Sequence, residues 1–320
     1  MIPNVLSIAG SDPSGGAGIQ ADLKTFAAFD VYGCAAITAL TVQNTRELSD
    51  VVPMPATLVS GQIDAVFADV DIHGVKIGML GCAEVASVVA ATLATHRPRN
   101  VVVDPVLRAG VGASLLDVEG LRVLRREVLP TAFVVTPNAL ETGALLGAPP
   151  PASLPDMREA AVALCGLGPQ WALVTGGHVD TGNECVDVLS NGHEIHEFRT
   201  SRVGGPARHG TGCTLSSAIA ALLALGASVP GACELAQQYV AAAILAGDEL
   251  LVGAGRRPLR HVRFDQLPLR ELPPGRVGTR ESSGPEDFTN RKQAAEYQEF
   301  ADNTERSAPA EPSVRSAESV

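Results

Sequence analysis

Lysine is nearly missing from this chain, whose 320 residues include only Lys24, Lys76 and Lys292. Counted with arginine there are 24 basic residues against 35 acidic ones, so the formal net charge is −11. A nucleic-acid groove needs a basic face, and we therefore expect no nucleic-acid partner. A lysine within the folded part of such a chain carries more information than usual.

Three other features are missing. No GxxxxGK[ST] motif occurs, which excludes a P-loop nucleotide hydrolase. The six cysteines form no CxxC pair and no regular framework, as expected for thiols in a reducing compartment. The first ten residues lack the basic start of a signal peptide, and Gly226 and Pro230 interrupt the alanine- and leucine-rich stretch 215–251. We expect a cytoplasmic protein with no membrane partner.

What is present is an alternation of short β-branched runs with longer helix-like segments, which predicts an α/β fold with a parallel sheet covered by helices on both faces. The predicted strands are Val5–Ala9, Cys34–Val42, Gly74–Ile77, Asn100–Asp104, Phe133–Val135 and Trp171–Val174. The predicted helices are Gly18–Phe29, Ala56–Ala68, Ala83–Thr95, Val118–Val128, Ala139–Leu146, Met157–Cys165, 211–225 and 230–251.

Two further segments complete the organisation. Val186–Leu189 and Glu194–Arg199, joined by Asn191-Gly192, predict a hairpin. After about Leu267 the chain is rich in Pro, Glu, Ser and Arg and poor in large apolar residues. We therefore expect one folded domain over 1–266 and a disordered tail over 267–320.

The chain reads Gly210-Thr211-Gly212-Cys213 directly before the apolar helix-like run Leu215–Leu225. Small residues let the backbone N–H groups of 210–213 converge, and the positive end of the helix points at the same place. This arrangement predicts an anion hole suited to a transferring phosphoryl group. Cys213 stands at its mouth, where a helix N-terminus lowers the pKa of a thiol and favours the thiolate.

Polar residues also gather where predicted strands end, which is where open parallel sheets bind ligands. They are Ser11-Asp12, Gln43-Asn44, Asp104, Thr136-Pro137-Asn138 and Thr175-Gly176-Gly177-His178. We therefore expect an active site at this edge of the sheet. His178 is a candidate for a phosphate contact or a structural hydrogen bond.

The glycine-rich loop after the first strand has three interpretations. Gly16-Ala17-Gly18-Ile19-Gln20-Ala21 satisfies the dinucleotide pattern GxGxxA. However, it begins several residues after the strand, and Gln43-Asn44 stand where an acidic residue would end the second strand. A plain turn into the helix is another possibility, and a glycine lid over a small substrate is the one we favour.

Asp104, Asn138 and Glu141 suit a hydrated Mg²⁺, because this ion prefers oxygen ligands and keeps several waters. The alternative is that Asn138 caps a helix and that Asp104 is solvated. Beside an anion hole the metal interpretation is favoured. Lys76, at the end of a buried-looking strand, either pairs with Asp104 or Glu141 or extends toward solvent.

Taken together, these segments resemble the hydroxymethylpyrimidine/phosphomethylpyrimidine kinases of the ribokinase-like superfamily. The resemblance covers about residues 4–262, and its first and last blocks are long enough to be highly specific. The similar segments are Ile8–Thr25, Thr38–Thr45, Lys76–Leu80, Asp104-Pro105-Val106, Thr136-Pro137-Asn138 with Glu141, Gly176-Gly177-His178 and His209–Ser216.

The resemblance implies a three-layer α/β/α sandwich and ATP-dependent phosphorylation of a pyrimidine hydroxymethyl group and then of the monophosphate, in thiamine biosynthesis. It also implies a homodimer. Gln43 would bind the aminopyrimidine edge, and the rest of the pocket would be formed by Asp22, Gly10, Met79 and Val106. Cys213 would be the base, in the place where most ribokinase-like enzymes carry an aspartate, and the amides of Gly210, Thr211, Gly212 and Cys213 would hold the γ-phosphoryl group. ATP and Mg²⁺ would be bound by Asp104, Asn138, Glu141, Thr175, His178 and His209, with Asp104 and Glu141 holding the metal mostly through water.

The chain departs from the family pattern where positive charge is usual. Thr175 replaces a lysine, Gly110-Val111 replace a Lys-Ser or Ser-Ser pair, and 205–208 replace a lysine-containing stretch. Arginine also binds phosphate, and the candidates to restore the charge are Arg108, Arg202 and Arg208. We expect the second phosphorylation to suffer more than the first, because its substrate carries more negative charge. The alternatives are a pyridoxal-type vitamin kinase and a catalytically weakened pyrimidine-binding protein.

Overall fold

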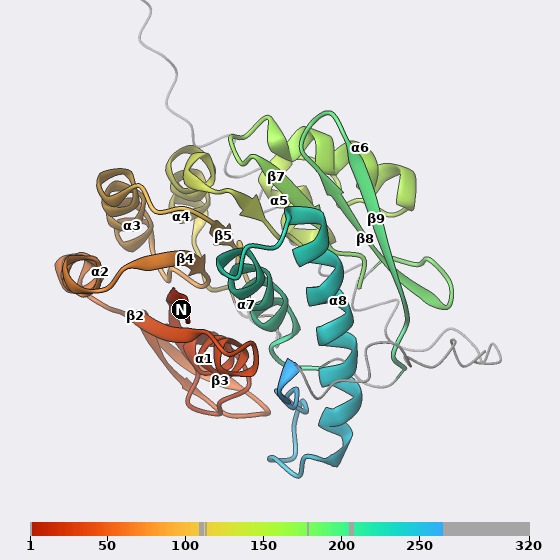
Figure 1. The fold of residues 1–320 in the computed structure, drawn as a ribbon, viewed down its shortest axis with the longest axis horizontal. Helices are drawn as coiled ribbons and strands as arrows, with labels where there is room; N and C mark the ends of the chain where they lie inside the picture. Colours follow the sequence, from red (N-terminus) through yellow and green to blue (C-terminus); the bar gives the residue numbers. More distant parts are fainter. Residues whose placement is uncertain (1, 109–111, 113, 178, 205–207, 265–320) are drawn as a thin grey trace, which may run out of the picture.

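The computed structural model describes residues 2–108, 112, 114–177, 179–204 and 208–264. Within them a nine-stranded sheet lies between two layers of helices (Figure 1). The strand order is β3-β2-β1-β4-β5-β6-β7-β8-β9. The strands are β1 (Asn4–Ser11), β2 (Tyr32–Gln43), β3 (Leu48–Pro53), β4 (Ile72–Ile77), β5 (Val101–Val103), β6 (Val134–Val135), β7 (Trp171–Val174), β8 (Glu184–Ser190) and β9 (Ile195–Ser201).

The middle of the sheet is parallel and its two edges are antiparallel. β2, β1, β4, β5, β6 and β7 run the same way, so their carboxyl ends meet along one edge. β3 is antiparallel to β2, and the predicted hairpin forms β8 and β9. The Asn191 side chain accepts hydrogen bonds from the amides of His193 and Glu194 in the hairpin turn. The predicted mostly parallel α/β sheet is thus confirmed, while β3 was missed.

The helices divide between the two faces of the sheet. One face carries α1 (Gly18–Ala28), α7 (Thr211–Ala224) and α8 (Val229–Ala246) over a core that includes Phe26, Ile219 and Tyr239. The other face has a core that includes Ile63, Val89 and Met157. Its helices are α2 (Ala56–Asp69), α3 (Ala83–His96), α4 (Val118–Val123), α5 (Ala139–Leu146) and α6 (Leu154–Cys165).

Short irregular turns account for most differences from the predicted helix bounds. The predicted helix Val118–Val128 is α4 followed by a π-helical turn, Leu124–Val128, and a 3₁₀ turn, Leu129–Thr131. α8 stops at Ala246, where the 3₁₀ turn Gly247–Glu249 follows. No helix among the described residues has the length and apolarity to cross a membrane. The predicted tail lies outside the described residues.

α7 is the helix that positions the site. It packs on β1, β4 and β5 between α1 and α8, and its residues from Thr214 to Leu223 are all buried. A helix that is apolar nearly all round is stable only when it is enclosed in this way. Its small alanines allow close packing on the strands. Its first turn lies at the carboxyl edge of the sheet (Figure 1).

Candidate active site

The first turn of α7 meets the residues that follow β5. Ser216 donates a hydrogen bond to Asp104 Oδ2 over 3.2 Å. A Cβ atom placed on Gly212 would lie 3.4 Å from the same oxygen. The amides of 210–213 and the carboxylate of Asp104 thus share one end of the sheet, as the sequence predicted.

Gly210 is the residue that lets α7 begin here. It caps the helix in the left-handed region, with φ +91°. A Cβ atom on it would lie 1.9 Å from the carbonyl oxygen of Gly16 in the glycine loop after β1. Only glycine has the backbone freedom and the lack of side chain that this contact needs.

The glycine loop is joined to this turn by a polar network around Asp12. Asp12 accepts hydrogen bonds from the amides of Ser14 and Ala17, and its Oδ2 lies 2.8 Å from His209 Nε2. Burial would raise the pKa of Asp12, but hydrogen bonds from His209 and Ser14 outweigh burial and lower it. Asp12 therefore remains ionised and fixes the loop. Its place directly after a strand predicted that it lies at the active-site edge, but not that it holds the glycine loop and His209.

His209 connects this network to the end of β2. Its Nε2 is 3.1 Å from Gln43 Nε2, at the end of β2. Its contacts thus connect Asp12 with Gln43, which is one of the residues predicted to bind the pyrimidine. This differs from the predicted place of His209 beside ATP and Mg²⁺, because the turn before Gly210 folds onto the glycine loop.

An apolar floor lies next to Gln43. A Cβ atom on Gly10 would lie 2.1 Å from Met79 Cε, so the absence of a side chain at Gly10 makes room for Met79. Met79 forms a small buried cluster with Ala39 and Leu115, against which Val106 packs. The structure therefore brings together Gly10, Met79 and Val106, three of the residues predicted to frame the substrate. Gln43 pairs with Leu48, which packs against the same cluster.

Asp22 itself is not in this pocket. It is 0% exposed, and its two carboxylate oxygens are taken by Lys76, Ser7 and Ser217. The prediction that Asp22 contacts the substrate is therefore wrong for this structure. A fully buried lysine needs a carboxylate partner, and that need is what Asp22 serves. Lys76 was predicted to pair with Asp104 or Glu141, but it donates its hydrogen bonds to Asp22 instead.

Cys213 lies in the first turn of α7, where it is partly buried. Burial raises the pKa of the thiol to about 12, with Asp22 and Asp104 adding to the effect and Lys76 opposing it. The prediction that the helix N-terminus favours the thiolate is therefore wrong for the protein without ligands. Desolvation and two nearby carboxylates outweigh the helix end.

Glu141 and Asp104 form a pair of buried carboxyls. Burial raises the pKa of both, and repulsion from Asp104 raises that of Glu141 further. Asn138 Oδ1 accepts from the Glu141 amide, and Glu141 Oε2 accepts from the Asn138 amide, so the two residues cap α5 reciprocally. The capping alternative for Asn138 thus holds, whereas Asp104 is buried rather than solvated.

This pair fits a hydrated Mg²⁺. Two carboxyls that repel each other gain from a divalent cation between them, and oxygen is the donor that Mg²⁺ prefers. Within the described part of the chain, no three His, Cys, Asp or Glu side chains lie close enough to hold a metal ion.

The phosphate side of the site is described only in part. Thr175 follows β7, and its amide donates to the carbonyl of Pro137 over 2.9 Å. Arg202 donates to the carbonyls of Gly177 and Val179, and Arg208 pairs with Asp248. The predicted site residue His178 and the departures at 110–111 and 205–207 lie outside the described residues. Arg202 is thus the predicted replacement cation that contacts the loop after β7.

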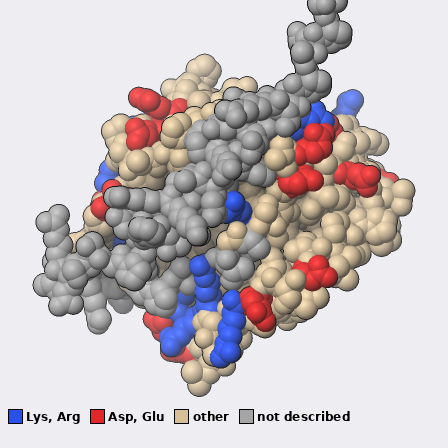
Figure 2. Space-filling model, turned by 180° about the vertical axis from the view of Figure 1, so that it is seen from behind, with Lys and Arg blue, Asp and Glu red and all other residues tan. Residues whose placement is uncertain are grey.

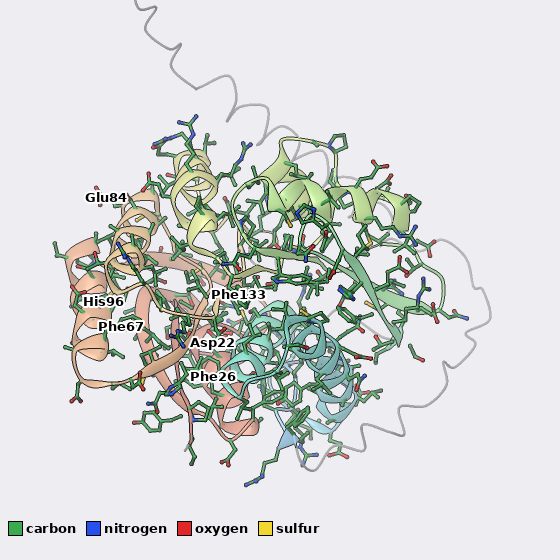
Figure 3. The ribbon with its side chains drawn as sticks, turned by 45° about the horizontal axis from the view of Figure 1, so that its top comes forward. Asp22, Phe26, Phe67, Glu84, His96 and Phe133 are labelled. Atoms are coloured by element: carbon green, nitrogen blue, oxygen red, sulfur yellow. The ribbon has the colours of Figure 1, made fainter. Side chains whose placement is uncertain are left out.

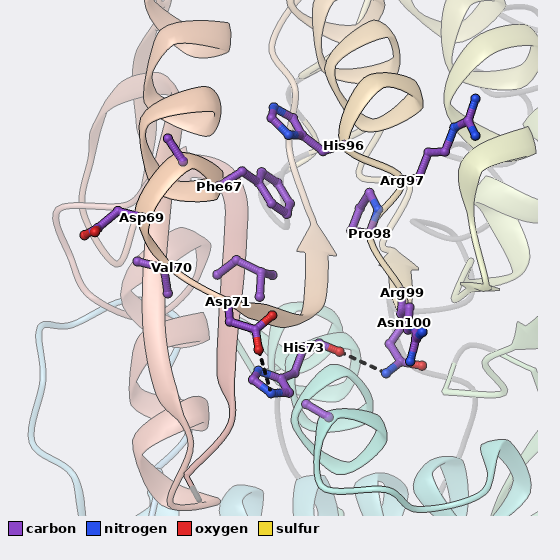
Figure 4. Close-up of a pocket in the computed structure, with 13 residues that line it drawn as sticks. Phe67, Asp69, Val70, Asp71, His73, His96, Arg97, Pro98, Arg99 and Asn100 are labelled. Carbon is purple, nitrogen blue, oxygen red and sulfur yellow. Dashed lines mark hydrogen bonds and ion pairs between the residues drawn. The ribbon is translucent and has the colours of Figure 1, made fainter.

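One described cleft lies away from this edge of the sheet. It has a volume of about 710 Å³ and is lined by the ends of α2 and α3 and the starts of β4 and β5, including Phe67, His73, Arg97 and Asn100 (Figure 4). These are the amino ends of the strands, opposite the edge that carries Cys213. Asp71 lies near His73, and Asn100 donates to the His73 carbonyl. None of the predicted site residues lines this cleft.

Charged side chains on the surface are mixed. On the face seen in Figure 2, the Lys and Arg side chains form small groups beside Asp and Glu rather than one continuous stripe. The exposed ion pairs among the described residues include Arg257–Asp248 and Arg199–Glu184. Exposed pairs of this kind contribute little stability.

The raised pKa of Glu141 predicts a pH-dependent stability. The folded protein holds this proton more tightly than the unfolded chain, so the stabilisation is complete below the ordinary pKa of a glutamate, about 4.3, and is lost as the pH rises through the folded-state value. Glu141→Gln cannot ionise. At about pH 9 the variant should raise the melting temperature by about 2–4 °C for each kcal/mol of destabilisation that ionised Glu141 causes in the wild-type protein. At about pH 5 the melting temperature should be nearly unchanged.

Thermal unfolding of the ligand-free protein at both pH values measures this effect. Glu84→Gln, at an exposed position in the first turn of α3 (Figure 3), is the matched control and should show no such pH dependence. Equal stabilisation of the Glu141 variant at both pH values would contradict the account.

A comparison with solved structures defines the class of the protein. The chain is similar to a pyridoxal kinase from Bacillus subtilis, solved as an ADP complex, with a TM-score of 0.77 and 34% identity over 83% of this chain and all of the other. The chain therefore has the three-layer ribokinase-like fold.

Sequence comparisons narrow the class. The profile of the phosphomethylpyrimidine kinase family matches residues 12–260. A hydroxymethylpyrimidine/phosphomethylpyrimidine kinase from Rhizobium meliloti is 45% identical over 256 residues, 80% of this chain and 96% of the relative. A thiamine biosynthesis bifunctional protein from Geobacter sulfurreducens is 44% identical, but the match spans only 52% of its length. The chain belongs to the phosphomethylpyrimidine kinase family.

Proposed function

We propose that this protein uses ATP to phosphorylate 4-amino-5-hydroxymethyl-2-methylpyrimidine and then its monophosphate, in thiamine biosynthesis. The observation that carries the proposal is the position of the α7 first turn. It lies against the glycine loop and His209–Gln43 on one side, and against Asp104 on the other. A helix N-terminus there can hold a phosphoryl group between an acceptor and a nucleotide.

The pyrimidine would occupy the pocket of Gly10, Met79 and Val106, with its aminopyrimidine edge on Gln43. The amides of Gly210, Thr211, Gly212 and Cys213 would hold the γ-phosphoryl group, and Cys213 would accept the proton of the attacking hydroxyl. Mg²⁺, held mostly through water by Asp104 and Glu141, would neutralise phosphate charge. Asn138, Thr175 and His178 complete the proposed ATP side, whereas His209, which contacts Asp12 and Gln43, would face the substrate.

We also infer a homodimer in the cytoplasm. Leu40, Val42 and Val52 are 45%, 58% and 48% exposed, and Leu40 pairs with Val52 across β2 and β3. An exposed apolar row on an outer strand pair supports an interface with a second copy. All six cysteines are free, which supports a reducing compartment.

Thr175 stands before Gly176-Gly177 where the family usually has a lysine, and this predicts that the two phosphorylation steps differ in efficiency. One missing preorganised contact costs about 10²–10³ in rate, and the monophosphate needs cationic support more than the alcohol does. We expect a higher kcat/KM for the alcohol than for the monophosphate, and Thr175→Lys should narrow the difference.

Steady-state assays with both acceptors measure this prediction. Thr95→Lys adds the same charge near the end of α3, at the opposite edge of the sheet, and should leave the ratio unchanged. Equal kcat/KM of the wild-type protein for the two acceptors would contradict this prediction. Release of ADP that depends on Mg²⁺ and the pyrimidine also separates an enzyme from a pyrimidine-binding protein.

A further inference from the structure

The loop after β7 is held from two sides, by Asp187 of β8 and by Arg202, which directly follows β9. β7 and β8 pair side by side as far as Val174 and Val188 (Figure 1). Just beyond this point the Gly176 amide donates a hydrogen bond to Asp187 Oδ1 over 2.8 Å. A Cβ atom on Gly176 would lie 2.0 Å from the Val186 carbonyl oxygen, so only glycine can lie this close to β8.

Asp187 is a carboxyl on a buried strand. It is 4% exposed, and the residues of β8 from Val186 to Ser190 are all buried. Burial raises the pKa of Asp187 to about 6, and hydrogen bonding, first of all from the Gly176 amide, limits this rise. The carboxyl is therefore mainly ionised at neutral pH. A buried charge is costly unless it is hydrogen-bonded, and here the loop amide supplies such a bond.

Arg202 holds the same loop through its carbonyls. Its Nη1 donates to the Gly177 carbonyl over 2.9 Å, and its Nη2 donates to the Val179 carbonyl over 2.7 Å and to that of Glu184 over 3.2 Å. A planar guanidinium can bridge several carbonyls in a fixed geometry, whereas an ammonium acts as a point charge. Because these donors are directed at the loop, Arg202 acts on the backbone rather than as a direct substitute for a lysine at position 175.

Gly177 lies between these two anchors and borders open space. It is exposed, and a Cβ atom on it would have no other atom within 4 Å. Its φ lies outside the left-handed region, so neither the backbone nor a neighbouring atom requires glycine here. Thr175, two residues earlier, forms a β-bridge with Asn138, which caps α5. Gly177 therefore leaves room at the carboxyl edge of the sheet, next to residues proposed to bind ATP.

We propose that Asp187 and Arg202 are positioning residues that hold Gly176-Gly177 in the conformation that receives the phosphates of the nucleotide. Asp187 fixes the amide at the start of the loop, and Arg202 fixes carbonyls further along it. Neither side chain touches the nucleotide; the exposed backbone at Gly177 does. This inference rests on the proposed kinase function, but its first test needs neither nucleotide nor turnover.

The first test is hydrogen exchange of the ligand-free protein, measured by mass spectrometry on peptides that contain Gly176 and Gly177. Asp187→Leu removes the acceptor and should speed exchange of these peptides at least about tenfold, as expected when a charged hydrogen-bond partner is lost. Asp187→Asn keeps an acceptor oxygen and should exchange at nearly the wild-type rate. Peptides of α3, on the other face of the sheet, should be unchanged in both variants. Wild-type exchange at Gly176 and Gly177 in Asp187→Leu would overturn the proposal, whether or not the protein binds nucleotide.

The second test is the affinity for ADP with Mg²⁺, measured by titration calorimetry, together with KM for the pyrimidine. Arg202→Met and Arg202→Lys should both weaken ADP binding about tenfold, because lysine keeps the charge but cannot bridge the carbonyls. KM for the pyrimidine should change little. Arg199→Met removes the same charge from β9, where Arg199 pairs with Glu184, and should bind ADP as the wild-type protein does.

The outcomes separate this proposal from the proposed function. Wild-type ADP affinity in Arg202→Met, or full recovery of affinity in Arg202→Lys, would overturn the role given to the guanidinium while leaving the kinase function intact. Absence of ADP binding by the wild-type protein would contradict both the proposed function and this proposal.

Discussion

Replacement of Cys213 by alanine should lower kcat by about 10²–10⁴, the usual contribution of a general base. KM for ATP and for the pyrimidine should change little, because the amides of 210–213 and the Gln43 pocket remain. For the wild-type protein, kcat/KM should rise with pH through the neutral range, since the pKa of Cys213 is raised to about 12 and the reactive thiolate is the minor form. Initial rates of ADP release over a range of pH measure both effects.

The matched control is Cys34→Ala, which removes a partly buried thiol near the start of β2, at the amino end of the strands and opposite the edge that carries Cys213. It should retain wild-type turnover. A Cys213→Ala protein that turns over normally, with the wild-type pH profile, removes the cysteine from the mechanism and leaves the anion hole to act alone.

Gly210→Ala is expected to be the most damaging change for phosphoryl binding. The new Cβ would meet the Gly16 carbonyl at 1.9 Å, so either α7 must begin elsewhere or the glycine loop must move. Both displace the converging amides, and the loss in kcat/KM should reach about 10²–10³. The substitution also adds the cost of a left-handed alanine, about 1–2 kcal/mol, which thermal unfolding measures.

Gly226→Ala isolates the clash from the backbone strain. Gly226 also has φ +91°, just after the other end of α7, but a Cβ atom there has nothing within 4 Å. It should lose stability by the left-handed cost alone and keep its kinetic constants. If the two variants lost activity equally, helix displacement would not be the cause, and the claim for the α7 first turn would fail.

The alternation of strands and helices made most of the fold predictable. Short apolar runs such as Val101–Val103 and Trp171–Val174 are most readily interpreted as buried strands. Asn191-Gly192 predicts a hairpin because this dipeptide favours a tight β-turn. β3 was not predicted because Leu48–Pro53 is an exposed edge strand that contains a proline and shows no alternation of apolar and polar residues. An outer strand depends on pairing with β2 more than on its own pattern.

The site residues that lie at strand ends or at the start of a helix could be predicted from their position in the chain. Strand ends placed Gln43, Asp104 and Thr175 at one edge, and glycines marked the start of α7. The partner of Lys76 was not predictable, because it depends on how α1 packs against β4, 54 residues apart in sequence. The protonation of Cys213 was missed for a related reason: its pKa reflects burial by several elements, which local sequence does not show.

The most direct test of the kinase account is ADP formation with 4-amino-5-hydroxymethyl-2-methylpyrimidine, its monophosphate and pyridoxal, measured side by side with and without Mg²⁺. We predict turnover that requires Mg²⁺, is fastest with the hydroxymethylpyrimidine and slower with its monophosphate. Preference for pyridoxal would contradict the assignment of the pocket, and no acceptor-dependent ADP formation with any of the three would contradict the account as a whole.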